Sequence, residues 1–395
     1  MAYSDTYTLA NYLRAVVNSG FGGWVWAPEV RDAKNDDDFA RRSQLMLFSA
    51  LSSMDGWYTG FTPFVPDVSP ASATMFAALS AERAALKTFL FSAYQRQTVS
   101  GVPVARHVVV DYDDDAAALS VVDDQYLLGD GLMVTPVIAT NATQRVVVFP
   151  RGDTWQSYWN RSIVYGGGTA LNVSAPQTVL PLFQRAGSVV PLLPRPDEKS
   201  SLVLRLADVG RSGTSVVYDD DGKTTRATTH DERFLLTLHP LYEAQSPRRA
   251  TTGSTSGTTG SRTSQRLRHL VAHVDAAGWT PTEWGGRLRW EVVGDGVASG
   301  GAASESNPAH PLDWSGVRCN GVAVPRFATE VELSASATKY GWAALSRGEI
   351  EALEAVPHAR AAPRFVLRTP LVSTLGWGLD CVVVRAGDAH DVTPI

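Results

Sequence analysis

Two small clusters have residue types that can do chemistry, and their spacing limits what that chemistry is. His269 and His273 are four residues apart, but no HExxH pattern accompanies them and the surrounding segment favours a strand. The run DDDG at 219–222 begins like a calcium loop, yet no Glu stands at the twelfth position, so a hairpin turn is the better interpretation. We therefore expect no metal site and no cofactor.

The overall composition excludes several classes of protein. The 395 residues carry 35 basic and 40 acidic side chains, a net charge of −5, so the chain lacks the positive field that nucleic acid requires. Cys319 and Cys381 are the only cysteines, which excludes a disulfide-rich scaffold and a cysteine-built zinc site. No apolar run reaches the roughly 18 residues of a membrane helix, so membrane insertion is not expected.

The elements that must position a site begin with an α/β layer. Apolar residues at helical spacing predict three helices, over residues 9–20, 37–51 and 71–99. Asp36 or Asp37 is expected to cap the second helix, and Gly101 with Pro103 is expected to end the third. An apolar strand at 21–26 separates the first two helices. This alternation of helix and strand is typical of an α/β layer.

After residue 101 the apolar period becomes that of strands. Short runs rich in Val, Leu, Tyr and Trp, separated by Gly, Pro, Asn and Asp, predict two successive antiparallel β-sandwiches. The Thr/Ser/Gly stretch near 245–265 cannot bury apolar area, so we expect a disordered insertion there. The predicted fold class is thus α/β plus all-β, with three parts over residues 1–100, 101–197 and 198–395.

Three motifs follow one another in the β-rich middle: DQYLLGDGLMVTPVIA from residue 124, VVVFPRGDTWQSYW from 146 and PLFQRAGSVVPLLP from 181. They resemble the C-terminal sandwich of glycoside hydrolase family 31, which includes α-glucosidases and related α-glycosidases. The later run VVYDDDGKT, from residue 216, resembles a hairpin of the family's distal sandwich. The resemblance implies that residues 1–100 are the C-terminal part of the family's (β/α)8 barrel. Within them, FARRSQLMLFSAL has Arg41 and Gln44 at the positions of a family motif.

The resemblance implies a retaining mechanism that hydrolyses O-glycosyl bonds with two carboxyl groups about 5–5.5 Å apart, a nucleophile and an acid/base. The family's nucleophilic Asp lies upstream of every residue that matches this chain. We therefore expect an N-terminally incomplete chain that is inactive alone. The family's acid/base position falls on Met1 by direct counting, and the nearest carboxylate is Asp5, which fits either that role or a helix cap.

The resemblance also implies sugar contacts at the C-terminal ends of the last barrel strands. After strand seven, Glu29 or Asp32 stands near the position of the family's glycone-binding Asp. Arg31 replaces a glycine there, and its charge favours an anionic or unusual glycone. After strand eight, Asp55 stands where the family often has a His, and it can accept hydrogen bonds from hydroxyls. For Glu29, Asp55 and the nearby Trp57, a surface turn is the alternative interpretation.

Three tryptophans lie in the same segments. Trp26 and Trp57 are candidates for stacking on pyranose faces, with core packing as the alternative for each. Alternation along the predicted strand points Trp24 away from Trp26, so we expect Trp24 to pack in the core. Carbohydrate is accordingly the expected partner. The alternative to a glycosidase is a non-catalytic carbohydrate-binding or structural homologue.

Three Asn-x-Ser/Thr triplets begin at Asn141, Asn160 and Asn172, all in predicted loops of the first sandwich. Together with the frequent secretory setting of the family, they favour the secretory pathway, lysosomal or extracellular, for the full-length protein. The first residues, MAYSDTYTLANYL, lack the basic and apolar regions of a signal peptide. A cytoplasmic location therefore stays open.

Overall fold

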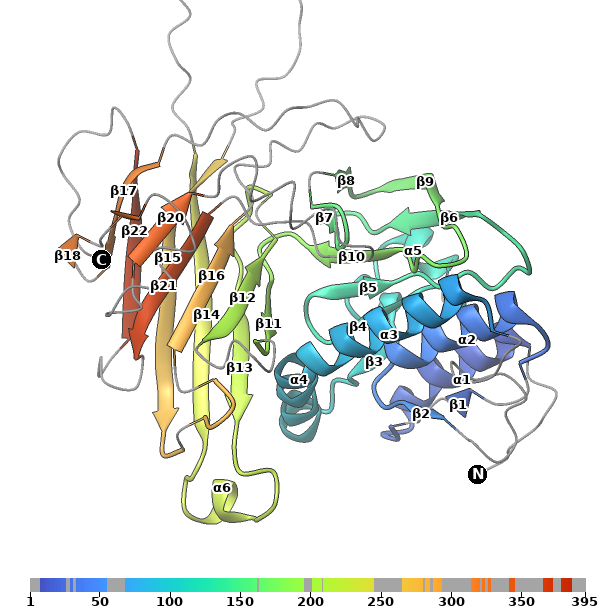
Figure 1. Ribbon diagram of the computed structural model, residues 1–395, viewed down its shortest axis with the longest axis horizontal. Coiled ribbons are helices and arrows are strands. Elements are labelled where there is room, and N and C mark those ends of the chain that lie inside the picture. Colours follow the sequence, from blue (N-terminus) through green and yellow to red (C-terminus); the bar gives the residue numbers. More distant parts are fainter. Residues whose placement is uncertain are drawn as a thin grey trace, which may run out of the picture.

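The computed structural model shows a part with helices and short strands beside a part made of longer strands (Figure 1). It describes residues 8–25, 29–30, 33–54, 68–121, 123–161, 163–194, 201–207, 209–244, 265–279, 281–284, 287–292, 314–319, 322–323, 326–327, 341–344, 365–371 and 378–385. The disordered insertion expected near 245–265 falls almost entirely outside these residues. Most described strands form small antiparallel sheets, which confirms the β-rich part of the predicted fold class.

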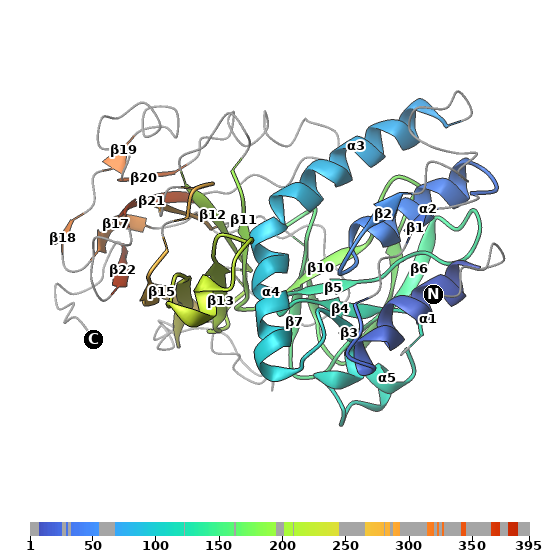
Figure 2. The same cartoon turned by 90° about the horizontal axis from the view of Figure 1, so that it is seen from below.

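The N-terminal part alternates helices with very short strands, and the hydrophobic periods predicted its first two helices. Its elements are α1 (Leu9–Phe21), β1 (Glu29–Val30), α2 (Asp36–Leu47), β2 (Ser53–Met54), α3 (Pro70–Ala85) and α4 (Lys87–Ser100). The predicted third helix is two helices, because the Ala85 carbonyl accepts from the Leu193 N–H (2.8 Å) and α3 ends there. Figure 2 shows α3 and α4 running in different directions. Gly101 ends α4 with a φ of 76°, as expected.

The prediction of a strand at 21–26 is wrong, and the first strand of this part is β1, at Glu29–Val30. α1 continues to Phe21, and the N–H groups of Gly22 and Gly23 bond back to its last turn, at Ser19 and Gly20. Gly23 has a φ of 73°, a conformation that glycine adopts without strain. The chain therefore turns where the apolar run suggested a strand. Trp24 follows this turn and is 77% exposed, so the core packing expected for it is also wrong.

The part after α4 is a sheet faced by a ribbon. Its elements are β3 (Ala105–His107), η1 (Val108–Val110), α5 (Ala116–Leu119), β4 (Tyr126–Leu128), β5 (Leu132–Val134), β6 (Gln144–Phe149), β7 (Thr154–Ser157), β8 (Val164–Gly166), β9 (Thr169–Ser174) and β10 (Leu182–Arg185). The sheet has the order β3-β4-β5-β10-β7-β8, and β6 pairs with β9 as a separate ribbon. Phe149 of the ribbon packs edge-on against Phe183 of the sheet, with ring centroids 4.9 Å apart.

The remaining strands form two further six-stranded sheets, which we call the distal sheets. They are β11 (Val189–Leu192), β12 (Leu202–Leu206), β13 (Ser215–Asp219), β14 (Phe234–Ala244), β15 (Gln265–Ala277), β16 (Arg287–Val292), β17 (Trp314–Cys319), β18 (Val322–Ala323), β19 (Arg326–Phe327), β20 (Gly341–Ala344), β21 (Phe365–Leu371) and β22 (Gly378–Arg385), with α6 (Arg226–Thr229) between β13 and β14. One sheet has the order β11-β12-β16-β21-β20-β19 and the other β13-β14-β15-β22-β17-β18.

The first of these sheets is mixed, whereas the sequence predicted an antiparallel sandwich. β12 pairs in parallel with β16, because the chain crosses to the other sheet through β13, β14 and β15 before it returns. β11 pairs with β12, so hydrogen bonds link residues on both sides of position 197.

Two small motifs behave as expected. Asp221 accepts from the N–H groups of Lys223 and Thr224, both at 3.0 Å, and Gly222 has a φ of 61°. The turn is real, but it begins a longer connection that includes α6 before β14 pairs back onto β13. His269 and His273 lie in a strand, β15, as predicted.

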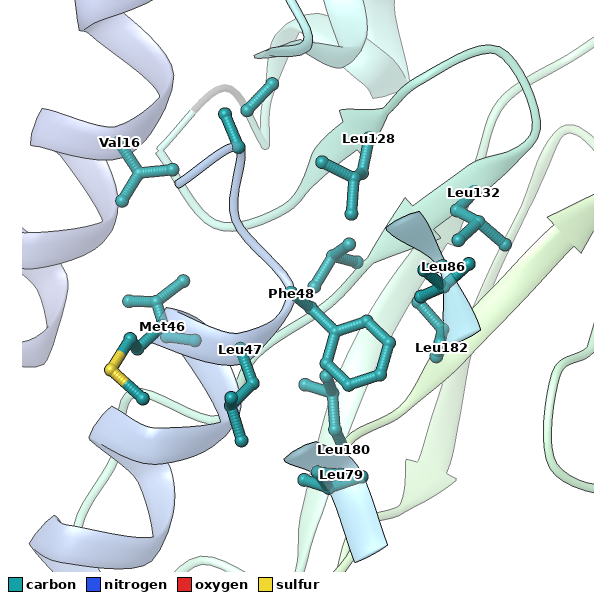
Figure 3. Close-up of a cluster of buried hydrophobic side chains, with 14 of the residues drawn as sticks. Val16, Met46, Leu47, Phe48, Leu79, Leu86, Leu128, Leu132, Leu180 and Leu182 are labelled. Atoms are coloured by element: carbon teal, nitrogen blue, oxygen red, sulfur yellow. The ribbon is translucent and has the colours of Figure 1, made fainter. Parts of the chain in front are cut away.

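A continuous hydrophobic core joins the helices to the first sheet (Figure 3). Phe48, fully buried, lies among side chains from both parts, including Leu79 of α3 and Leu182 of β10. Its ring also meets Trp159 edge-on, with centroids 6.0 Å apart. Burial of one such side chain stabilises a fold by about 2–3 kcal/mol. The helices and the first sheet therefore share one core.

Candidate functional site

The described part of the predicted site rests on a parallel strand pair. Glu29 pairs with Ser53 and Val30 pairs with Met54. β1 and β2 end at the same register position, so their last residues, Val30 and Met54, are neighbours on strands roughly 5 Å apart. α2 makes the crossover that parallel neighbours need. Val30 is fully buried, which anchors the end of β1 in the core.

The first turn of α2 holds the segment that arrives from β1. The Asn35 side chain caps α2 by accepting from the Asp38 N–H at 3.0 Å, where Asp36 or Asp37 had been expected. Asp38 in turn accepts from the Lys34 N–H at 3.0 Å. Arg42 donates from Nε to both oxygens of Asp38, at 3.0 and 2.9 Å. Asp38 therefore links the residue before the cap, Lys34, to Arg42, one turn further along α2, and so holds the start of the helix.

Asp36 ties the start of α2 to the start of α3. Its carboxylate accepts four hydrogen bonds, from Ser69 N (2.9 Å), Ser69 Oγ (2.9 Å), Ser72 Oγ (3.0 Å) and Gln177 Nε2 (2.6 Å). Desolvation raises the pKa of Asp36, but these donors outweigh it and the net pKa is lowered. Ser69 is the cap of α3, so Asp36 sets where the chain re-enters a helix after β2.

Arg41 joins α2 to the loops of the first sheet and is 1% exposed. Its guanidinium donates to the carbonyls of Ala142 (2.8 Å), Ala175 (2.9 Å), Pro176 (3.3 Å) and Val179 (3.4 Å). Asp37 lies 3.5 Å from Arg41 Nε and accepts from the Asn141 N–H at 2.9 Å. Gln44 donates to the Gln177 carbonyl at 2.7 Å. Burial lowers the pKa of Arg41, against the opposing effect of Asp37.

The segment that leads into β2 is held by α3 and β4. Arg83 donates to the carbonyl oxygens of Leu47, Ser49 and Ala50, with Nη2 2.7 Å from the Ala50 oxygen. The Tyr126 hydroxyl donates to the Phe48 carbonyl at 2.8 Å. Burial lowers the pKa of Arg83 and raises the pKa of Tyr126. These contacts occupy carbonyls that the end of α2 leaves without helical partners.

Together these contacts hold the described residues at the start of α2, before β2 and at the start of α3. The sequence motif includes Arg41 and Gln44, but the sequence indicated Asp36 and Asp37 only as helix-cap candidates and gave no sign of the role of Arg83. The available signal was the acidic run at 36–38 at a helix start, where carboxylates are favoured by the helix dipole. Within the described ranges, no group of three or more His, Cys, Asp or Glu residues is placed to share a metal ion.

Residues 101–190 match the family model described as the glycosyl hydrolase family 31 C-terminal domain. The chain contains a glycoside hydrolase family 31 C-terminal domain. The resemblance seen in the motifs from residues 124, 146 and 181 is thereby confirmed. Arg41 and Gln44 therefore donate hydrogen bonds to loops of this domain, at the carbonyls of Ala175 and Gln177.

Two named relatives match part of the chain. Alpha-glucosidase 2 of Bacillus thermoamyloliquefaciens is 32% identical over 141 residues, which are 34% of this chain and 17% of that protein. The alpha-xylosidase of Saccharolobus solfataricus is 29% identical over 128 residues, 31% of this chain and 17% of that protein. The matches thus span about a sixth of the length of these relatives. Both relatives are named as glycosidases, and this chain is homologous to them over the matched segments.

A solved structure shows the same fold over nearly the whole chain. The family 31 dextranase of Flavobacterium johnsoniae, in a complex with isomaltotriose, aligns with a TM-score of 0.67 and 16% identity. The alignment covers 95% of this chain and 42% of that protein. At this identity the likeness concerns the fold alone.

Most of the sequence-predicted family 31 site residues lie outside the described part of the chain. These are Asp5, Trp26, Arg31, Asp32, Asp55 and Trp57. The backbone of Glu29 is described, and it pairs with Ser53. The structure therefore describes the framework around the predicted contacts, and the roles of these residues stay predictions. Among the described helices, none has the length and apolar character to cross a membrane.

Proposed function

We propose that this sequence is the C-terminal portion of a retaining family 31 α-glycosidase, and that residues 1–100 complete its (β/α)8 barrel. The observation that carries the proposal is the parallel β1–β2 pair joined by α2, whose two strands end side by side. Two neighbouring barrel strands have this geometry, and barrel active sites lie at the C-terminal ends of strands. The alignment to the dextranase over 95% of the chain supports the same placement.

The proposed sugar contacts follow from these strand ends. Glu29 is the first residue of the two-residue strand β1, Arg31 follows β1 directly in the sequence, and Asp55 follows β2 directly. Trp26 and Trp57 supply stacking surfaces. The contacts of Asp36 and Arg41 hold the helix that connects the two strands, so they keep the two segments in register with each other.

The proposed reaction is double displacement at an α-linked sugar, with Asp5 as acid/base. The nucleophile is proposed to come from barrel residues other than those in this sequence. The named functions of the relatives indicate a glucose- or xylose-type glycone. Arg31 adds a cation near that sugar, which favours a glycone or substituent with negative charge.

We further propose a secretory location, lysosomal or extracellular. Asn141, Asn160 and Asn172 have exposed side chains, as N-glycosylation requires. Asn172 lies on β9 and donates to Gln144 of the neighbouring strand. An N-linked glycan leaves one hydrogen on this nitrogen, so glycosylation at Asn172 is compatible with that contact.

The test compares two proteins, the 395-residue chain and the longest natural reading frame that contains it. Each is assayed with nitrophenyl α-glucoside and α-xyloside. We expect turnover only by the longer protein, with retention of configuration. Asp5→Asn in that protein should lower kcat by about 10²–10⁴-fold, since it removes an acid/base group.

A matched control separates chemistry from folding. Asp123→Asn removes a carboxylate that forms only a half-exposed ion pair with Arg14, so it should leave turnover unchanged. If the 395-residue chain turns over a glycoside and Asp5→Ala abolishes that turnover, the proposal that the nucleophile comes from other barrel residues is wrong. Glycan binding without turnover by the longer protein would overturn the enzymatic proposal.

A further inference from the structure

The two cysteines of the chain occupy partner positions in one sheet. Cys319 is the last residue of β17, Cys381 lies in β22, and the antiparallel register places them directly opposite each other. The neighbouring pairs Arg318–Val382 and Val317–Val383 continue the same ladder, so the register holds over consecutive residues. No other cysteine occurs in the 395 residues.

Backbone geometry makes this pair suitable for a covalent bond. Directly opposed residues of antiparallel strands have Cα atoms about 5.5 Å apart in a hydrogen-bonded pair and about 4.5 Å apart in the other type. Disulfides span Cα separations of about 4.4–6.8 Å. Either type of pair therefore falls within the range that a disulfide needs, without movement of the backbone.

We propose that Cys319 and Cys381 form a cross-strand disulfide. The two thiols lose two protons and two electrons as the S–S bond forms, and a disulfide oxidant such as oxidised glutathione accepts them and is reduced to two thiols. In the cell this bond depends on the secretory location proposed above, because cytosolic thiols are kept reduced. The chemistry is independent of any glycosidase activity.

The bond closes a loop of roughly 60 residues that contains β18, β19, β20 and β21. Closing a loop of that length restricts the unfolded chain and stabilises the folded one. In the sheet order β15-β22-β17-β18, β17 is the last strand before the two-residue edge strand β18. The disulfide therefore fastens the end of the sheet that has the least strand pairing to hold it.

The experiment uses the full chain, equilibrated in oxidised and reduced glutathione. After oxidation we expect the intact mass to fall by two hydrogens, no thiol to react in denaturant, and the peptides containing Cys319 and Cys381 to be linked. Reduction should lower the Tm of the distal sheets by about 10 °C. The Cys319→Ser/Cys381→Ser variant should show no such difference between the two buffers.

Two results would overturn the proposal. One is a folded wild-type chain that keeps two reactive thiols after equilibration in oxidised glutathione. The other is a disulfide between two copies of the chain, seen on a non-reducing gel. The mass measurement needs no variant, so it decides the question even where the double substitution prevents folding. Neither measurement involves a sugar, so failure here leaves the proposed glycosidase function untouched, and loss of that function leaves the disulfide testable.

Discussion

Two helices connect the N-terminal part to the β-rich parts, and they do so with different chemistry. α2 meets the family 31 domain through Arg41, whose buried guanidinium reaches four backbone carbonyls. α4 meets the distal sheets through β13, where Ser92 Oγ accepts from the Tyr218 N–H at 2.9 Å and Phe91 contacts the Tyr218 ring. The ion pair between Lys87 and Glu283, at 2.5 Å, is largely exposed.

We call the contact of α2 with the family 31 domain the α2 junction, and the contact of α4 with the distal sheets the α4 junction. The two should differ in how well they tolerate substitutions. A buried cation that satisfies several carbonyls is costly to remove, because the carbonyls then lose their donors away from water. An exposed ion pair contributes about 0–1 kcal/mol. The α2 junction thus depends on a buried cation that is costly to remove, whereas the ion pair at the α4 junction contributes little.

The two junctions also respond to pH in opposite directions. Hydrogen bonds from Ser69 and Gln177 outweigh desolvation and lower the pKa of Asp36 at the α2 junction. Beside α4, burial and the charges of Glu283 and Asp220 raise the pKa of Asp219 to about 6, against opposing effects that include the charge of Lys87. Ionised Asp36 therefore stabilises its junction, whereas ionised Asp219 destabilises its own.

The largest effect should come from Arg41→Ala. Several buried carbonyls lose their donor and Asp37 loses its cation, so we expect a loss of about 3–5 kcal/mol in the free energy of unfolding. Urea denaturation followed by tryptophan fluorescence measures it. The matched control is Arg14→Ala, which breaks a half-exposed ion pair with Asp123 and should cost at most about 1 kcal/mol. Equal losses in the two variants would remove the distinction between buried and exposed contacts.

Asp219→Asn should have a smaller effect of the opposite sign. The pKa of about 6 in the folded chain exceeds the unfolded value near 3.9, so wild-type stability falls as pH rises from about 4 to about 6. The amide has no charge to bury, and we expect it to stabilise the chain at pH 7 by about 1–2 kcal/mol, after allowance for solvent screening. Denaturation curves from pH 4 to pH 8 test this. A variant whose free energy of unfolding falls with pH as steeply as that of the wild type contradicts it.

Asp36→Asn should give the smallest change and the opposite pH dependence. Because the pKa of the folded state is lowered, the contribution of Asp36 is present above the unfolded pKa and is lost as pH falls through the folded value. We expect a loss of about 1 kcal/mol at pH 7 that shrinks in acid. Asp114→Asn, in an exposed loop, serves as the control. If Asp36→Asn and Asp219→Asn change the free energy of unfolding in the same direction at pH 7, the contrast between the junctions is wrong.

Local sequence patterns predicted much of the framework. The 3.6-residue period gave α1 and α2, Gly101 marked the end of α4, and alternating runs located most described strands of the family 31 domain. These features depend on contacts within one or two turns or on the two faces of one strand. The motifs that begin at residues 124, 146 and 181 identified the family for the same reason, since each is a contiguous run.

Long-range contacts decided the rest. The break between α3 and α4 depends on Leu193, and the role of Asp36 depends on Gln177, more than 100 residues away in each case. The pairing of Cys319 with Cys381 depends on the register between two distant strands. A local pattern specifies what one segment can form, but hydrogen-bond partners and registers arise only when distant segments pack, and those are the features that position the proposed site.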